Sequence, residues 1–121
     1  IKENEAFRNV EGPYWNQKFY VSFKEGGRIW IYINTHKNIL VLNVFVKKDE
    51  FNASDIAKLL GIKLFDRNSP LSEKLQLESS VEVINRGALD KIRIRIKNDF
   101  DIRSEKFEKF LEDCLSSFKG T

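Results

Sequence analysis

The sequence predicts an α+β fold: an antiparallel meander sheet of four to five strands packed against a C-terminal amphipathic helix and a shorter middle helix. Three observations support this prediction. Residues 18–46 form three runs rich in β-branched and aromatic residues, separated by short polar breaks. Residues 91–97 alternate between basic and apolar side chains, and residues 104–118 place apolar side chains at helical spacing.

Size and composition indicate one globular domain. The chain has 121 residues, of which 41% are hydrophobic and 32% are charged, and domains most often contain about 100–150 residues. We therefore expect a single domain over residues 1–121, with an N-terminal lead-in at 1–17 and a core at 18–118. The chain contains no methionine, even at position 1, so we expect a fragment of a longer protein.

Cysteine usage and hydrophobicity bear on the cellular compartment. Cys114 is the single cysteine, which excludes an internal disulfide and is typical of a reducing compartment. The longest apolar run, residues 39–46, is far shorter than the ~20 residues needed to cross a bilayer. Residues 1–5 lack the apolar core of a signal peptide. These features predict a cytoplasmic protein with no membrane partner.

The first two strands form a hairpin behind a short lead-in. Residues 3–10 can make two helical turns that direct Phe7 and Val10 to the core. A strand at 18–24 alternates apolar and polar side chains, and Gly26-Gly27 supplies the positive φ of a tight turn. In the next strand, residues 28–33, strict alternation places Ile29, Ile31 and Ile33 on one face and Trp30 and Tyr32 on the other.

The third strand and the middle helix follow. Residues 39–46 are apolar on both faces, which is typical of a strand in mid-sheet with material packed on each side. A short helix then begins at Asn52 or Ser54 as its cap and runs to Leu60, with Gly61 in the C′ position.

Residues 62–90 support more than one interpretation. Residues 62–65 can form a short strand, and residues 66–70 read as a loop. Leu71 and Leu75 suit a helical turn, whereas Leu75, Leu77, Val81 and Val83 suit strands. We favour extended structure from about residue 80.

The C-terminal part has the clearest patterns. In the strand at 91–97, the isoleucines face inwards and the basic residues face outwards. Ser104 caps the final helix, which we expect to pack on the inward faces of the strands at 18–24 and 91–97. Its apolar stripe consists of Phe107, Phe110, Leu111, Cys114, Leu115 and Phe118.

Catalytic and metal chemistry have no support in the sequence. His36 is the single histidine and lies in a predicted turn, and Cys114 lies on an apolar stripe where a buried thiol is inert. No glycine-rich phosphate loop is present. An acidic residue, any residue and then lysine, which restriction-type nucleases place on a strand, occurs nowhere in the chain. We expect no enzyme activity, no metal site and no cofactor.

One group of residues favours nucleic-acid binding. The first two strands carry aromatic residues on their alternate face, with cations nearby. If the basic row of the strand at 91–97 lies on the same side of the sheet, aromatic and basic side chains alternate across that face. Such a face stacks bases and neutralises phosphates, and the net charge of +3 with a pI of about 9.0 is compatible with it. The candidate residues are Tyr20, Lys24, Arg28, Trp30, Tyr32, Lys91, Arg93 and Arg95.

The alternative is that this face has a structural role. Trp30 and Tyr32 would then pack beneath the middle helix or the N-terminal segment, and the basic row would be a solvated strand face. Under that interpretation the chain is a protein-interaction or regulatory module of a larger prokaryotic protein. We therefore expect a non-catalytic accessory domain, with either nucleic acid or a protein as its partner.

The order of elements also resembles a known family. "YVSFK" at 20–24, the doubly apolar strand ending near 47–50, "DKIRIRIKN" at 90–98 and the closing helix resemble a small prokaryotic domain of unknown function labelled "putative transport protein". That domain occurs alone or at the C-terminal end of proteins, some of them related to DNA or restriction systems. The resemblance covers residues 18–118, departs from the family at 85–90 and carries over no functional residues. It implies an accessory module of a larger protein.

Overall fold

The fold is known from a computed structural model that describes residues 5–14, 20–36, 39–65, 78–97 and 104–121. These residues form a seven-stranded sheet and two α-helices, so the predicted α+β class is confirmed. In chain order the elements are η1 (Glu5–Phe7), β1 (Glu11–Tyr14), β2 (Tyr20–Glu25), β3 (Arg28–His36), β4 (Ile39–Lys47), α1 (Ala53–Leu60), β5 (Lys63–Leu64), β6 (Ser80–Arg86), β7 (Leu89–Ile96) and α3 (Glu105–Lys119).

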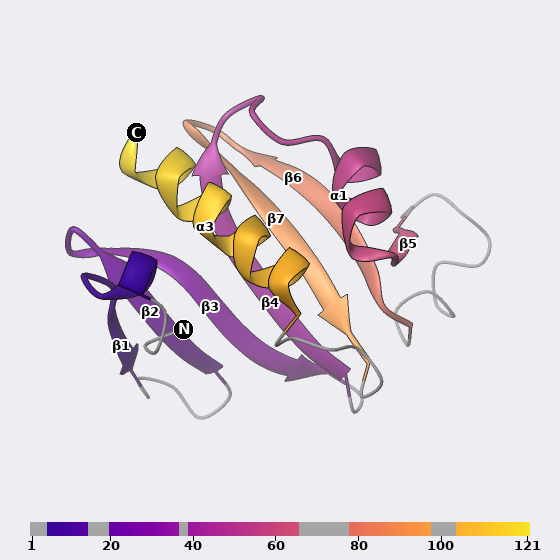
Figure 1. Cartoon of the computed structure of the whole chain (residues 1–121), viewed down its shortest axis with the longest axis horizontal. Helices are drawn as coiled ribbons and strands as arrows, with labels where there is room; N and C mark the ends of the chain where they lie inside the picture. The colour runs from indigo at the N-terminus through magenta and orange to yellow at the C-terminus, as the bar shows by residue number, and fades with distance from the viewer. Residues whose placement is uncertain (1–4, 15–19, 37–38, 66–77, 98–103) are drawn as a thin grey trace.

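The sheet runs in the order β1-β2-β3-β4-β7-β6-β5, and α3 lies over its middle strands, roughly along their direction (Figure 1). All neighbouring strands are antiparallel except β5 and β6, which are parallel. The prediction of four to five strands was too low because the two edge strands are only four and two residues long, too short to show a period. Extended structure from residue 80 is present as β6, whereas residues 66–77 lie outside the described residues.

One face of the sheet carries the core. Ile31 pairs with Val44, Val44 with Ile92, and Ile92 with Val83, and cross-strand partners point to the same side. This row runs across four strands beneath α3, whose six predicted stripe residues are all buried. Burial of such side chains stabilises the fold by about 1.5–3 kcal/mol each, so the docking of α3 is a main source of stability.

Both helices have the caps that their sequences encode. The Ser104 hydroxyl accepts a hydrogen bond of 3.2 Å from the Phe107 N–H at the start of α3. At the start of α1 the cap is Asn52, whose side-chain oxygen accepts hydrogen bonds from the Ser54 N–H at 2.8 Å and the Asp55 N–H at 3.4 Å. α1 ends at Gly61 with φ of +67° and packs beside α3 on the same face of the sheet.

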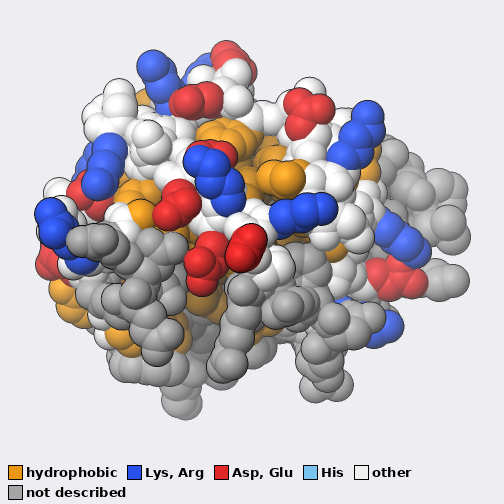
Figure 2. All heavy atoms as spheres, in the orientation of Figure 1, with side chains coloured by type: hydrophobic (Ala, Val, Ile, Leu, Met, Phe, Trp, Pro, Cys, Tyr) orange, Lys and Arg blue, Asp and Glu red, His pale blue; other side chains and the backbone are white. Residues whose placement is uncertain are grey.

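The outer surface on this side of the molecule is polar. Figure 2 shows Lys and Arg side chains interspersed with Asp and Glu side chains over it, rather than a patch of one sign. On α3, Lys109 and Asp113 form an i,i+4 ion pair of 3.1 Å. On the described part of this side, the charges of the two signs therefore alternate instead of forming a basic patch (Figure 2).

A β-bulge in β3 alters the predicted faces of the sheet. Phe23 pairs with Ile31, but Lys24 pairs with Ile29, which leaves Trp30 as an extra residue on β3. Trp30 is fully buried and stacks on Phe7, with ring centroids 5.8 Å apart. The expectation that Trp30 shares a face with Tyr32 is therefore wrong. Instead, the indole packs beneath the N-terminal segment. This is one of the two positions that the alternative interpretation, a structural role for this face, gives to Trp30.

Candidate functional site

The face of the sheet opposite α3, here called the second face, brings together five of the eight predicted site residues: Lys24, Tyr32, Lys91, Arg93 and Arg95. Tyr32 pairs with Asn43, Asn43 with Arg93, and Arg93 with Glu82, so their side chains share this face. The basic row of β7 thus lies on the same side as Tyr32. This is the arrangement that the nucleic-acid hypothesis requires.

Of the remaining predicted residues, Arg28 and Trp30 do not join this surface, and Lys24 lies at its β2 margin. Arg28 lies on the helix side, with its guanidinium carbon 4.4 Å from the centre of the Phe118 ring, and it donates a hydrogen bond of 3.4 Å to the Phe118 carbonyl. It therefore stabilises the C-terminal end of α3. Trp30 belongs to the core, and the side chain of Tyr20 lies outside the described residues. Lys24 is half-buried, with its ammonium 5.0 Å from the centre of the Tyr14 ring.

Arg95 lies on the second face, but its guanidinium already forms contacts within the fold. Its guanidinium forms an ion pair of 2.8 Å with Glu82, and the two side chains are only 10% and 9% exposed. The guanidinium carbon also lies 4.1 Å from the centre of the Phe65 ring. This buried pair ties β6 to β7 and leaves Arg95 unable to contact a ligand without breaking it.

Lys91 is a buried cation without a carboxylate partner among the described residues. It is 1% exposed, and its ammonium donates a hydrogen bond of 3.0 Å to the Tyr32 hydroxyl. The ammonium lies 5.6 Å from the centre of the same ring. No described carboxylate lies within ion-pairing distance of it. Its positive charge is therefore offset only by neutral groups within the described part of the chain.

Arg93 completes a polar network across three strands. It donates a hydrogen bond of 3.0 Å from Nε to the Asn43 side-chain oxygen, and the Asn43 amide donates one of 3.4 Å to the Tyr32 carbonyl. These contacts connect β7 through β4 to β3. Arg93 is half-buried on the second face.

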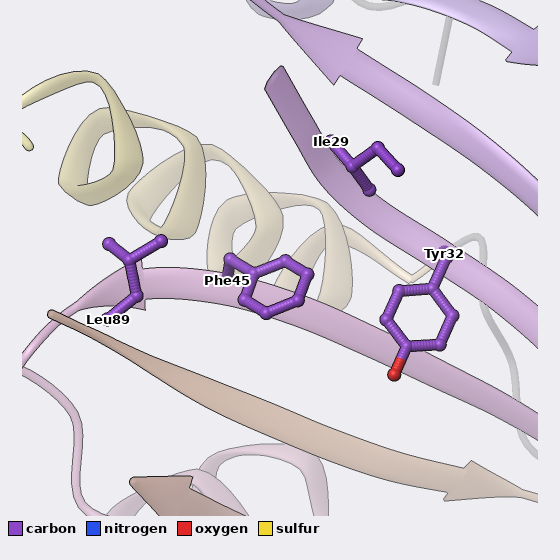
Figure 3. Close-up of a pocket in the computed structure, with 4 residues that line it drawn as sticks. All are labelled: Ile29, Tyr32, Phe45 and Leu89. Atoms are coloured by element: carbon purple, nitrogen blue, oxygen red, sulfur yellow. The ribbon is translucent and has the colours of Figure 1, made fainter. Parts of the chain in front are cut away.

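Beside this network lies an apolar hollow of about 490 Å³. It is lined by Ile29 and Tyr32 of β3, Phe45 of β4 and Leu89 of β7. Figure 3 shows the Phe45 ring between Leu89 on one side and Tyr32 on the other. The Tyr32 and Phe45 rings are tilted by 38°, with their centroids 6.0 Å apart. The hollow is large enough to bind a small organic group.

Three cations lie around this hollow. The cross-strand partner of Ile29 is Lys24, that of Leu89 is Lys47, and that of Phe45 is Lys91. Directly opposed side chains have Cβ atoms about 4.5–5.5 Å apart, so each of these three lining residues has a cation beside it. Lys24 lies on the β2 side, Lys47 at the end of β4 and Lys91 on β7.

Few carboxylates oppose these cations. Among the described strands, the register places Glu82 and Glu11 on the second face. Glu82 is paired with Arg95, and Glu11 on β1 is the cross-strand partner of Lys24 and accepts a hydrogen bond from the Tyr14 hydroxyl. Among the described strand residues around the hollow, cations therefore outnumber carboxylates, whereas the lining is apolar.

Sequence reasoning did not identify four residues of this site: Ile29, Phe45, Leu89 and Lys47. Strict alternation assigned Ile29 to the core, and the bulge reverses that assignment. Phe45 lies in a strand that is apolar on both faces, so its exposure carries no sequence signal. Leu89 begins β7 inside the ambiguous segment. A search for cations opposite apolar residues could have found Lys47, but only with the strand register known.

Other functional chemistry finds little support in the described residues. They contain no group of three His, Cys, Asp or Glu residues placed to hold a metal ion. Cys114 is fully buried, and burial, with smaller contributions from Asp113 and Glu50, raises the pKa of its thiol well above 9.0. A thiol in that state is a poor nucleophile. Neither described helix is long and apolar enough to span a membrane.

Comparison of the chain with protein-family models, with curated proteins and with solved structures finds no match. The resemblance to the "putative transport protein" domain therefore stays a prediction.

Proposed function

We propose that the protein is a non-catalytic accessory domain that binds single-stranded nucleic acid through the second face. The observation that supports this proposal is the register that places a cation beside Ile29, Phe45 and Leu89 around one apolar hollow. Proteins that bind single strands combine aromatic stacking platforms with a positively charged path for the backbone. Tyr32 and Phe45 supply the first, and Lys24, Lys47 and Arg93 supply the second.

A single strand fits this surface better than a duplex. The aromatic rings lie in a hollow, and only an unstacked base can enter a hollow and stack on a side chain. The bases of a duplex are stacked on one another, so a duplex would reach only the surrounding cations. The net charge of +3 and the pI of about 9.0 favour association with a polyanion.

The direct test is binding of fluorescein-labelled single-stranded and duplex oligonucleotides, followed by fluorescence anisotropy at several salt concentrations. We expect tighter binding of the single strand, with log K falling by ~0.7 per phosphate contact for each unit of log salt. Lys47→Glu should weaken binding several-fold. Lys106→Glu makes the same charge change at an exposed position on α3 and should have little effect.

Two outcomes would reject the proposal. One is the absence of any binding at ~50 mM salt, where phosphate contacts are strongest. The other is an equal loss of affinity in Lys47→Glu and Lys106→Glu, which would mean that the whole molecule, rather than the second face, attracts the oligonucleotide.

A second candidate function is binding of a protein partner at the β5 edge of the sheet. Leu59 of α1 and Leu64 of β5 are 44% and 48% exposed, and α1 packs against β5. β5 is the edge strand of the described sheet, and an extended segment of a partner can add to such an edge. Peptides selected by phage display against the protein should lose affinity for Leu64→Asp. Unchanged affinity in that variant would reject this candidate.

A further inference from the structure

We infer that the hollow lined by Ile29, Tyr32, Phe45 and Leu89 is a pocket for one unpaired nucleobase, and that Lys91 makes it prefer bases with keto oxygens. This inference rests on the proposed function and names the part of the nucleic acid that the second face recognises.

The lining suits a flat aromatic guest. The Tyr32 and Phe45 rings are tilted by 38°, with centroids 6.0 Å apart, so a base can stack on one ring while its edge meets the other. Ile29 and Leu89 flank these rings from the strands on either side of β4. Ile29 is 37% exposed, and an entering base would remove that apolar surface from water.

The surrounding charges suit the backbone that carries the base. Lys24 lies beside Ile29, and Lys47 lies beside Leu89. Lys47 is exposed and can contact a phosphate directly, whereas the half-buried Lys24 has its ammonium over the Tyr14 ring on the β1 side. An aliphatic ligand would use the lining but not the cations, and a free phosphate would use the cations but not the lining. A nucleotide within a strand uses both.

Lys91 adds selectivity among bases. Its ammonium is buried against the Tyr32 ring that forms one wall of the hollow, and no described carboxylate pairs with it. A buried positive charge attracts an electron-rich oxygen more strongly than a solvated one does. Thymine, uracil and guanine present keto oxygens, whereas adenine presents none. The pocket should therefore favour thymine and uracil over adenine.

The test compares oligo-dT with oligo-dA of ~10 nucleotides, a length within the usual site size, by equilibrium binding to wild type and three variants. Phe45→Ala should weaken binding of both strands by ~10-fold through lost stacking. Lys91→Met should reduce the preference for dT over dA while keeping most of the affinity. Phe51→Ala alters a half-buried phenylalanine that contacts Phe110 on the helix side and should leave both affinities unchanged.

The outcomes separate this inference from the proposed function. If the oligonucleotides bind but Phe45→Ala and Phe51→Ala behave alike, the base pocket is wrong and the binding surface remains. If Lys91→Met keeps the full preference for dT, the role of Lys91 is wrong. If neither oligonucleotide binds wild type, both proposals fail. If poly-glutamate binds as tightly as oligo-dT and loses affinity in Phe45→Ala, the hollow takes an acidic peptide instead of a base.

Discussion

Trp30 stacks on Phe7 at a ring-centroid distance of 5.8 Å and an interplanar angle of 29°, because the bulge in β3 turns its indole into the core. The same bulge turns Ile29 outwards, where it becomes one wall of the hollow. One extra residue in β3 thus anchors the N-terminal segment and shapes the second face. Stability and the proposed binding site share a structural cause.

The first prediction concerns this anchor. Trp30→Ala should lower the free energy of unfolding by about 3–5 kcal/mol, because it leaves a large cavity in the core. Trp30→Phe should cost less, since it keeps a ring against Phe7 and removes an indole N–H that has no hydrogen-bond partner among the described residues. Urea denaturation measures both. Ile29→Ala is the control and should cost under ~1 kcal/mol at its exposed position. Equal losses at Trp30 and Ile29 would contradict the bulge.

How much of the fold the sequence predicts depends on the length of each pattern. The alternation of residues 91–97 and the stripe of α3 are long, and they predict the faces that the structure shows. The run Ile29-Trp30-Ile31-Tyr32-Ile33 also alternates, yet its first residues face the other way. A bulge shifts the alternation by one residue, and only the tertiary burial of the indole against Phe7 reveals it.

The candidate site was only partly predictable for a related reason. Tyr32 and Arg93 were identified because aromatic and basic residues are recognisable in a sequence. The pairing of Arg95 with Glu82 was not, since Glu82 lies in the ambiguous segment and its partner depends on the register of β6 with β7. Lys47 and Phe45 become candidate site residues only once their cross-strand neighbours are known, and no local sequence pattern shows which residues pair across strands.

The second prediction concerns the buried ion pair of Arg95 and Glu82. Arg95→Met alone should lower the free energy of unfolding by about 3–5 kcal/mol, because it removes the guanidinium that is ion-paired with the buried Glu82 carboxylate. The double variant Arg95→Met/Glu82→Leu should recover most of that loss. Urea denaturation of both single variants and the double variant gives the coupling energy. A coupling energy near zero would show that the pair contributes no more than a surface ion pair.

The third prediction distinguishes the two caps that the sequence allows for α1. Asn52→Ala should lower the free energy of unfolding by about 1 kcal/mol, because Asn52 accepts the hydrogen bonds of the first turn. Ser54→Ala, two residues later, should change it by less than ~0.5 kcal/mol. Thermal unfolding of the two variants provides the comparison. A larger loss in Ser54→Ala would mean that the helix begins at Ser54.

The fourth prediction uses Cys114, the single cysteine of the chain. Burial, followed by the charges of Asp113 and Glu50, raises the pKa of its thiol in the folded state, so the folded protein holds this proton more tightly than the unfolded chain does. Its contribution to stability is complete below the unfolded pKa of about 8.5. That contribution is lost as the pH rises from there towards the folded pKa, by up to ~1.4 kcal/mol per pH unit.

The matched control for this prediction is Cys114→Ala. This variant should be less stable than wild type near neutral pH, because it leaves a small cavity, but its stability should fall less steeply above pH ~8.5. Native wild-type protein should also react slowly with a thiol reagent and rapidly in denaturant. Parallel pH profiles of the two proteins, or fast native labelling, would show that the thiol is accessible.

The last prediction concerns the conflict between stability and binding at Lys91. Its ammonium is 1% exposed and is offset by the Tyr32 hydroxyl and ring rather than by a described carboxylate. Replacing a buried cation of this kind with an apolar side chain of similar length removes the cost of its desolvation. Lys91→Met should therefore raise the free energy of unfolding by about 1 kcal/mol, while reducing the preference for oligo-dT.

Tyr32→Phe should have the opposite effect on stability. It removes the hydroxyl oxygen that accepts the hydrogen bond from Lys91, so it should lower the free energy of unfolding by about 1–3 kcal/mol. Urea denaturation of the two variants measures both changes. A loss of stability in Lys91→Met would mean that the ammonium is needed for folding, and that a binding role is not required to explain its burial.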